Sequence, residues 1–240
     1  MKVLIVGGAA RLGPHVIRAL EGEHTLRVTD IVPVETQHEF QQVDIASPAE
    51  VHGAAEGIDA IVNCSVEREG RRRAAFDVNS RGCYNMMRAA VSHGISRVIN
   101  TGPHFTIQGN TYTTFDYEIN PDVPPHPSTN PYALSKGVGQ EICKVFTENH
   151  DVHVLTYLFY EFRDHNNPTL RGDHPFAISW RDAAEAIRLG LEVDLATLPS
   201  RCEAFNIHAD LPHQRFSNEK NKRLLGFTPQ DRLEAMWQRR

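Results

Sequence analysis

A tyrosine and a lysine stand four residues apart in the segment NPYALSKGVGQEICKVF, residues 130–146. In a helix that begins at Pro131, this spacing places Tyr132 and Lys136 on one face of the first turns. A phenol can act as a general acid or base when a neighbouring ammonium group lowers its pKa from near 10 towards the working pH. The same spacing also arises by chance in many helices, so the pair gains meaning only from the elements around it.

A glycine-containing loop follows the first hydrophobic segment, in VLIVGGAARLG (3–13). Residues 2–6 are continuously apolar, which is typical of a strand buried on both faces, and a helical pattern follows the loop up to Leu20. Gly7 suits a tight turn, and Gly13 allows the helix to pack close to the strand, so that helix N-terminal amides face a pyrophosphate. Ala10 stands where a middle glycine is common, and its methyl group limits how closely the loop can approach a phosphate. The strand–turn–helix context favours a dinucleotide site over a simple turn.

Asp30 ends the second predicted strand, residues 25–30. A carboxylate at this position accepts a hydrogen bond from the ribose 2′-hydroxyl of NAD and repels the 2′-phosphate of NADP. The alternative is a strand-end aspartate that caps a turn. Arg11 and Arg27 are candidate phosphate ligands, but Asp30 favours NAD as the cofactor.

Predicted strands and helices alternate along the whole chain. This alternation predicts an α/β fold with a doubly wound parallel sheet, the Rossmann fold. We expect a NAD-binding domain over residues 1–160 and a small C-terminal substrate-binding region over 161–240, interleaved with the last sheet strand. The predicted strands cover residues 2–6, 25–30, 39–44, 58–64, 96–101, 152–160 and 203–208, and the later helices cover 47–57, 71–93, 131–149, 180–192 and a terminal stretch. Residues 102–130 are predicted to form a long functional loop.

The composition excludes several classes of protein. The 240 residues carry a net charge of −5, which gives no electrostatic footprint for nucleic acid, and the basic run 71–73 fits a solvated helix start. The four cysteines are scattered, which indicates reduced thiols in a cytoplasmic protein. The 13 histidines show no metal-ligand spacing, so no metal is expected. Neither a membrane-length apolar run nor a signal peptide is visible, so no membrane association is expected.

The sequence resembles the extended short-chain dehydrogenase/reductase family, also called the NAD-dependent epimerase/dehydratase family, and most of all its uronate dehydrogenase-like members. The resemblance rests on VLIVGGAARLG, VDIAS (43–47), FDVNSRGCYNMMRAA (76–90), PYALSK (131–136), WRDAAEAI (180–187) and RLLGFTP (223–229). It implies that Tyr132 is the acid/base and that Lys136 lowers its pKa and binds the nicotinamide ribose. It also implies a homodimer formed through helices 72–92 and 132–149. The implied cofactor-binding residues are Gly7, Ala10, Arg11, Leu12, Gly13, Asp30, Asp44, Ile45, Asn63, Cys64, Ser65, Asn79, Thr101, Tyr132 and Lys136.

The chain departs from the family pattern at the substrate end. Gly102 and Pro103 stand where the family has serines, one of which hydrogen-bonds the substrate oxygen. The nearest substitutes are Thr101, His104 and Thr106. Tyr157 also occupies the sixth-strand position where an arginine is common.

The likeness to uronate dehydrogenases implies a substrate pocket that includes Ser65, His104 and Tyr160. Arg171 is the candidate clamp for a substrate carboxylate, because a guanidinium can donate two parallel hydrogen bonds. A solvated surface arginine is an equally simple interpretation. Glu161 disfavours an acidic substrate unless Arg171 or Arg163 neutralises it.

Together these features predict an NAD-dependent oxidoreductase or epimerase that acts on a small free sugar, sugar acid or polyol-like molecule through a Tyr132–Lys136 acid/base pair. Tyr132 removes the hydroxyl proton, and His104 or a neighbouring hydroxyl orients the oxygen. Only residues 161–240 follow the sixth predicted strand, which leaves little chain for a nucleotide-sugar pocket. The alternative is a non-catalytic NAD-binding regulatory or interaction protein, which the missing serine favours.

Overall fold

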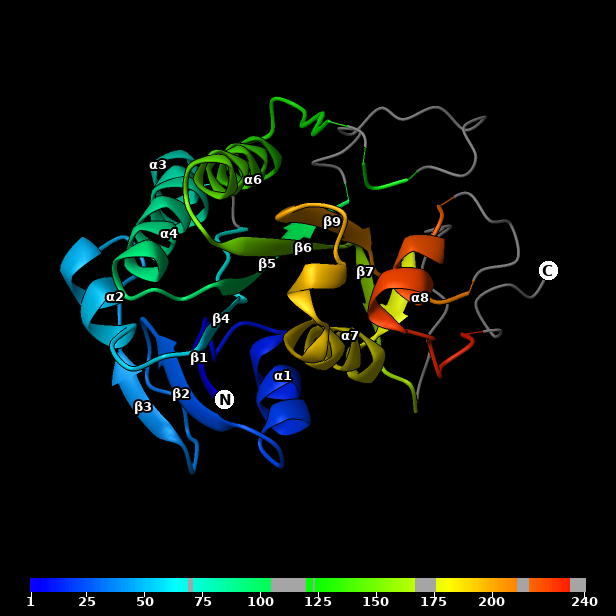
Figure 1. Ribbon diagram of the computed structural model, residues 1–240, viewed down its shortest axis with the longest axis horizontal. Helices are drawn as coiled ribbons and strands as arrows, with labels where there is room; N and C mark the ends of the chain where they lie inside the picture. The colour runs from blue at the N-terminus through cyan, green and yellow to red at the C-terminus, as the bar shows by residue number, and fades with distance from the viewer. Residues whose placement is uncertain (69–70, 105–119, 123, 167–175, 211–215, 234–240) are drawn as a thin grey trace.

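A computed structural model describes residues 1–68, 71–104, 120–122, 124–166, 176–210 and 216–233 (Figure 1). In these residues a single seven-stranded parallel sheet forms the centre of the molecule, with strand order β3-β2-β1-β4-β5-β6-β9. The order changes direction between β1 and β4, which makes the sheet doubly wound, as the alternation of elements predicts. The strands are β1 (Lys2–Val6), β2 (Thr25–Asp30), β3 (Glu39–Gln42), β4 (Ala60–Asn63), β5 (Arg97–Pro103), β6 (His153–Phe159) and β9 (Cys202–Asn206).

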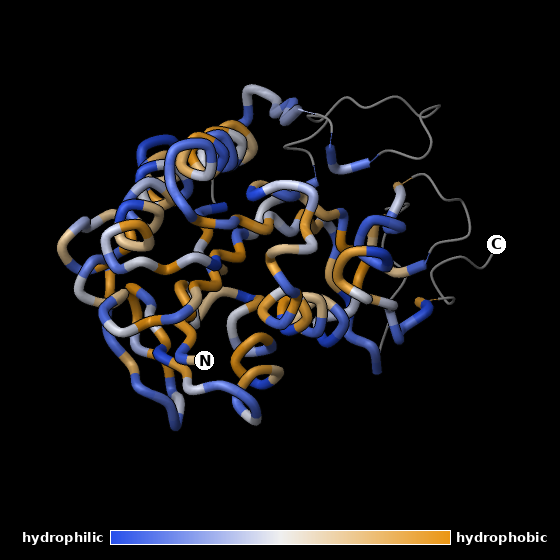
Figure 2. The backbone as a smooth tube through the Cα atoms, viewed as in Figure 1, coloured by the Kyte–Doolittle hydropathy of each residue, from blue (hydrophilic) through white to orange (hydrophobic). Residues whose placement is uncertain are grey.

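Helices cover both faces of this sheet (Figure 1). One face carries α1 (Gly13–Leu20) and α7 (Trp180–Glu192), and the other carries α2 (Pro48–Ala54), α3 (Arg72–Phe76), α4 (Gly82–Ser92) and α6 (Pro131–Asn149). Alternate residues of β1 contribute to two hydrophobic cores. Val3 and Ile5 pack with α1 and α7. Leu4 and Val6 pack with α2 and α4 on the other face. Hydrophobic segments therefore run through the interior strands, and the outer loops are hydrophilic (Figure 2).

Several local features differ from the sequence-based prediction. β5 continues through Gly102 and Pro103, which pair with Leu158 and Phe159, so the predicted loop starts two residues later than expected. The predicted long helix contains a π-helical turn, η1 (Asp77–Arg81), between α3 and α4. A two-stranded parallel sheet, β7 (Glu161–Arg163) with β8 (Ala177–Ser179), was not predicted, because three-residue strands carry no readable periodicity.

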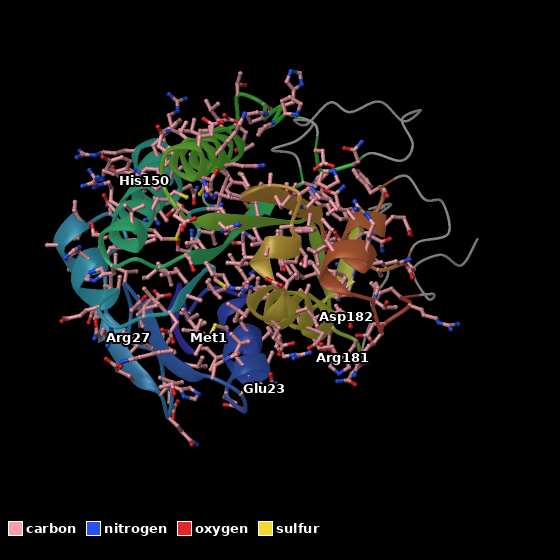
Figure 3. The ribbon with its side chains drawn as sticks, in the orientation of Figure 1. Met1, Glu23, Arg27, His150, Arg181 and Asp182 are labelled. Carbon is pink, nitrogen blue, oxygen red and sulfur yellow. The ribbon has the colours of Figure 1, made fainter. Side chains whose placement is uncertain are left out.

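The C-terminal part of the chain contributes a strand to the central sheet and a helix to one of its faces. α7 packs beside α1, and β9 pairs with β6, while the turn η2 (Leu195–Thr197) and α8 (Glu219–Leu225) lie further out. The Asp182 carboxylate accepts hydrogen bonds from the amides of Gln230 (3.1 Å) and Asp231 (2.9 Å). Figure 3 shows Asp182 next to Arg181, which pairs with Asp231. The division at residue 160 remains a prediction.

None of the helices in the described residues is both long and apolar enough to cross a membrane.

Candidate functional site

Two adjoining cavities open at the C-terminal ends of the central strands, on either side of the switch between β1 and β4. Ala10 and Val66 line both cavities. The first has a volume of about 500 Å³ and is lined by Ala10, Arg11, Leu12, Cys64, Val66, Arg68, Thr101, Gly102, Pro103, Tyr132, Lys136, Phe159, Tyr160, Phe162 and Trp180. The second measures about 550 Å³, and its lining includes Gly7, Asp30, Asp44, Ile45, Ser65 and Glu67. Open parallel sheets bind ligands in this crevice.

The glycine loop adopts a geometry that side chains would disrupt. Gly7 has a φ of +87°, and a Cβ built on it would lie 2.6 Å from the amide nitrogen of Ser65. A Cβ on Gly13 would lie 2.4 Å from the carbonyl oxygen of Gly8 and 2.6 Å from that of Gly7. Both glycines are therefore required for the strand–loop–helix packing that holds the start of α1 at the cavities.

Asp30 joins the glycine loop to the second cavity. Its Oδ2 accepts a hydrogen bond from the amide of Ala9 (2.9 Å), and its Oδ1 accepts one from the amide of Val32 (3.2 Å). The residue thus caps the turn and also lines the second cavity, and its contact with a ribose hydroxyl stays a prediction.

Arg27, labelled in Figure 3, is not available to a ligand, because its side chain is buried within β2. Its guanidinium binds Glu39 (2.7 Å) and the carbonyl of Ala54 (2.7 Å). Of the two arginines considered as phosphate ligands, the exposed Arg11 lines the first cavity.

The helix that carries Tyr132 and Lys136 begins as the sequence predicts. The Asn130 side chain caps α6 by accepting a hydrogen bond from the Tyr132 amide (2.9 Å), and Pro131 occupies the first turn. Lys136 Nζ donates to the carbonyl oxygens of Ser65 (2.9 Å) and Thr101 (3.0 Å), which lie just after β4 and within β5. Burial lowers the pKa of Lys136 to about 8.

The Tyr132 phenol faces the same cavity as Lys136. Burial raises the pKa of Tyr132, and the charge of Arg68 and a hydrogen bond from its guanidinium to the phenol oppose this shift. Arg68 and Lys136 are both cations that line the cavity with Tyr132, and the Lys136 ammonium donates to two carbonyls. That Lys136 lowers the pKa of Tyr132 stays a prediction for the site with NAD bound.

Asn79 lies behind the pair rather than in either cavity. It sits in the π-helical turn η1, and its Nδ2 donates to Ser135 Oγ (3.0 Å) and to the Glu67 carbonyl (3.2 Å). Its Oδ1 accepts from the Glu67 amide (3.2 Å). The turn packs tightly on α6, since a Cβ on Gly139 would lie 2.4 Å from the Asn79 carbonyl oxygen. Asn79 therefore supports the loop after β4 and does not line the predicted cofactor site.

The three residues after β4 have different positions. The Asn63 side chain is buried between the strands, where its Nδ2 donates to Asn100 Oδ1 (3.0 Å) and its Oδ1 accepts from Ser65 Oγ (2.7 Å). Cys64 lines the first cavity, Ser65 lines the second, and Asn63 lines neither. Burial raises the pKa of Cys64 to about 12, so this thiol stays protonated.

His104 does not reach the cavity, contrary to the prediction that it orients the substrate. Its buried ring stands edge-on to Tyr160, with ring centroids 4.1 Å apart, and next to Phe176 at 5.6 Å. The cause is the longer β5: the His104 amide bonds the carbonyl of Phe159 (2.9 Å), and this places the ring behind Tyr160. Tyr160 itself lines the cavity, and its contact with a substrate stays a prediction. Thr106 and Arg171 lie outside the described residues.

Sequence reasoning missed Arg68, Phe162 and Trp180, which also line the first cavity. The Phe162 and Trp180 rings stack with centroids 4.2 Å apart and form an apolar wall. Both lie after β6, and the available signal was an aromatic residue, Phe162, at the start of the predicted substrate-binding region.

The charge around the first cavity is positive. Among the described residues that line it, Arg11, Arg68 and Lys136 are cationic and none is acidic. Glu161 lies next to the cavity-lining Tyr160, but its carboxylate pairs with the buried Arg163. Arg163 thus supplies the neutralisation that an acidic ligand would require.

Comparisons with known proteins agree with this geometry. The model of the NAD dependent epimerase/dehydratase family matches residues 3–161. The uronate dehydrogenase of Pseudomonas putida is 27% identical over 161 residues, and the match covers 65% of this chain and 59% of that protein. The NAD-dependent glucose-6-phosphate dehydrogenase of Haloferax volcanii is 22% identical, with 95% of this chain and 93% of that protein covered. The chain spans less than two thirds of the length of the curated uronate dehydrogenases that it matches.

The fold also matches solved structures. A glucuronic acid dehydrogenase from Chromohalobacter salexigens superposes with a TM-score of 0.82 at 23% identity, covering 98% of this chain and 86% of that chain. At this identity the likeness concerns the fold alone.

Proposed function

The chain belongs to the NAD dependent epimerase/dehydratase family, and we propose that within this family it oxidises a small free sugar acid with NAD. The observation that carries the proposal is the pair of adjoining cavities. One contains Asp30 and the glycine loop, and the other contains Tyr132 and Lys136. A dinucleotide has two halves, and the shared lining by Ala10 and Val66 sets the two cavities side by side, as its two halves require.

The residues present fit NAD. Gly7 and Gly13 allow the close strand–loop–helix packing that brings the amides at the start of α1 to a pyrophosphate. Asp30 offers a carboxylate to a ribose hydroxyl, and Asp44 and Ile45 line the cavity proposed for the adenine. When bound, NAD supplies the hydride acceptor. The chain supplies the base: Tyr132 takes the proton of the substrate hydroxyl as the hydrogen on the same carbon leaves as hydride. Lys136 adds positive charge beside the reacting oxygen.

The proposal of an acidic substrate rests on charge. A carboxylate entering the first cavity meets three cationic side chains, and Glu161 is already paired with Arg163. Arg171 remains our candidate for the direct carboxylate clamp, because a guanidinium fork suits a carboxylate. The names of the Pseudomonas relatives, which are uronate dehydrogenases, point in the same direction.

A substrate panel tests this function. We expect the full chain with NAD to produce NADH from uronates faster than from the corresponding neutral sugars or from nucleotide-linked uronates. Turnover confined to neutral or nucleotide-linked sugars would contradict the acidic-substrate proposal. Tight NAD binding without turnover of any compound would favour the non-catalytic alternative.

Asp30 is expected to select NAD over NADP. Because its carboxylate lines the second cavity, it repels a 2′-phosphate, and we expect calorimetry to show at least about tenfold tighter binding of NADH than of NADPH, or about 1.4 kcal/mol. Asp30→Asn removes the charge, keeps the shape and should narrow this preference. Equal or tighter NADPH binding by the unchanged protein would show that Asp30 only caps the turn.

We also propose that a second copy of the chain covers the outer face of α4 and α6. Tyr84 on α4 and Val145 on α6 are 48% and 52% exposed, and with Val138 they border an apolar hollow of about 550 Å³. Apolar faces of this kind mark protein interfaces. Light scattering should give the mass of two chains, and Val145→Asp should give the mass of one. A monomeric unchanged protein would refute the interface.

A further inference from the structure

Two cysteine thiols are in contact inside the molecule, and neither of them lines one of the two cavities of the proposed site. Cys83 on α4 and Cys143 on α6 place their sulfur atoms 3.3 Å apart, and both side chains are buried. They stand 60 positions apart in the sequence, so the contact depends on how the two helices pack. The structure describes all four cysteines, and within this described part only these two have their sulfur atoms in contact.

A glycine on α6 allows the close packing that brings the thiols together. Gly139 lies one turn before Cys143, and a Cβ built on it would lie 2.4 Å from the Asn79 carbonyl oxygen and 3.5 Å from the Cys83 Cβ. A larger residue at this position would therefore push α6 away from α4. The two sulfur atoms have to approach by only about 1.2 Å more to reach the length of a disulfide bond, about 2.05 Å, and side-chain rotation supplies such a movement.

The surroundings of the pair favour one thiolate. A hydrogen bond from Cys143 lowers the pKa of the Cys83 thiol, and the charge of Lys136 acts in the same direction, whereas burial opposes the shift. By contrast, burial raises the pKa of Cys64 to about 12 and that of Cys202 to about 11. Because the thiolate is the nucleophile in sulfur chemistry, Cys83 is the cysteine best suited to react with an oxidant.

We propose that Cys83 and Cys143 form a redox modification site, at which hydrogen peroxide produces a reversible disulfide that ties α4 to α6. The Cys83 thiolate attacks one peroxide oxygen, the O–O bond breaks, and the departing hydroxide takes up the proton that the thiol has lost. The Cys143 sulfur then attacks the resulting sulfenic sulfur, the S–O bond breaks, and a second water leaves with the Cys143 proton. Two thiols are thus oxidised to one disulfide, and one peroxide is reduced to two waters.

The disulfide would act on the helix that carries the Tyr132–Lys136 pair. Lys136 lies two turns before Cys143 on α6, and its ammonium holds the carbonyls of Ser65 and Thr101. A covalent tie between α4 and α6 restricts the unfolded chain and so favours the folded protein. The oxidised protein is therefore expected to resist heat better than the reduced protein, and this expectation is independent of the proposed dehydrogenase function.

Peroxide treatment followed by alkylation tests the site. The reduced full chain is treated with hydrogen peroxide in its native state, its remaining thiols are alkylated in denaturant, and the chain and its peptides are analysed by mass spectrometry. We expect two of the four cysteines to be alkylated, a peptide pair linked through Cys83 and Cys143, and complete reversal by dithiothreitol. Cys202→Ala, the matched control at a partly exposed cysteine, should form the same disulfide, whereas Cys143→Ala should not.

Thermal unfolding of the same samples tests the tie between the helices. Peroxide should raise the midpoint of unfolding by at least about 4 °C in the unchanged protein and in Cys202→Ala, and it should give no rise in Cys143→Ala. Four alkylated cysteines after treatment, a disulfide between any other pair, or a sulfinic acid at Cys83 without the linked peptides would overturn the proposal. An oxidised chain that melts at or below the temperature of the reduced chain would overturn the stabilising tie.

Discussion

Replacement of Tyr132 by phenylalanine is expected to lower kcat for sugar-acid oxidation by about 10²–10⁴-fold, the usual contribution of a general acid–base group. The substitution removes one oxygen from the wall of the first cavity and leaves the aromatic ring in place. NAD binding, measured by calorimetry, should remain unchanged, because the second cavity and the glycine loop are untouched. A variant that binds NAD but hardly oxidises the sugar acid would show that the Tyr132 hydroxyl serves the chemical step and not cofactor binding.

Tyr157→Phe is the matched control for this experiment. Tyr157 is fully buried in β6, lines neither cavity, and its hydroxyl has no hydrogen-bond partner among the described residues. Loss of an unsatisfied buried hydroxyl removes a desolvation cost, so this variant should be slightly more stable and fully active. Near-normal turnover in Tyr132→Phe would refute the assigned role, and an equal loss in both variants would point to a general effect of the substitution.

Gly13→Ala is expected to abolish measurable NAD binding and to lower the free energy of unfolding by about 1–3 kcal/mol, the typical cost of overpacking. The added methyl would lie 2.4 Å from the Gly8 carbonyl oxygen, which belongs to the main chain of the glycine loop and cannot turn aside as a flexible side chain could. Relief of this clash requires α1 to move away from the loop, and the helix amides move with it. Urea denaturation and calorimetry measure the two effects separately.

Gly53→Ala provides the control, because it makes the same substitution at a helical position of α2 where a Cβ meets nothing within 4 Å. Alanine is the better helix former, so this variant should gain up to about 1 kcal/mol and bind NAD normally. If Gly13→Ala also bound NAD normally, the close packing of the loop would not be what forms the cofactor site.

The sheet could be predicted from the sequence because its signals are local. Continuous apolar runs such as residues 2–6 indicate strands buried on both faces, and the alternation with helices indicates a doubly wound parallel sheet, which the structure confirms. The start of α6 was equally readable, since Asn130 and Pro131 form a cap and a first turn. Signals of this kind need no knowledge of distant residues.

Parts of the site depended on contacts between distant segments, and these could not be predicted. Arg68 lines the first cavity together with Tyr132, and Asn79 binds the backbone of the neighbouring Glu67 in the loop after β4, which no local pattern reports. His104 was assigned to the substrate because it follows a strand, but the strand is longer than predicted and the ring packs against Tyr160. By contrast, the sequence left Arg163 and Arg171 open as partners of Glu161, and the structure pairs Glu161 with Arg163 in the same short strand, β7.

The most direct measurement of the central claim follows the fate of carbon-bound hydrogen. The full chain is incubated with NAD and a uronate that carries deuterium on its carbons, and the cofactor and the sugar product are analysed by mass spectrometry. The account predicts NADH that contains one deuterium, formed in equal amount to an oxidised sugar acid, and the loss of both products in Tyr132→Phe. An epimerised sugar acid without net NADH, or NADH formation that persists in Tyr132→Phe, would contradict it.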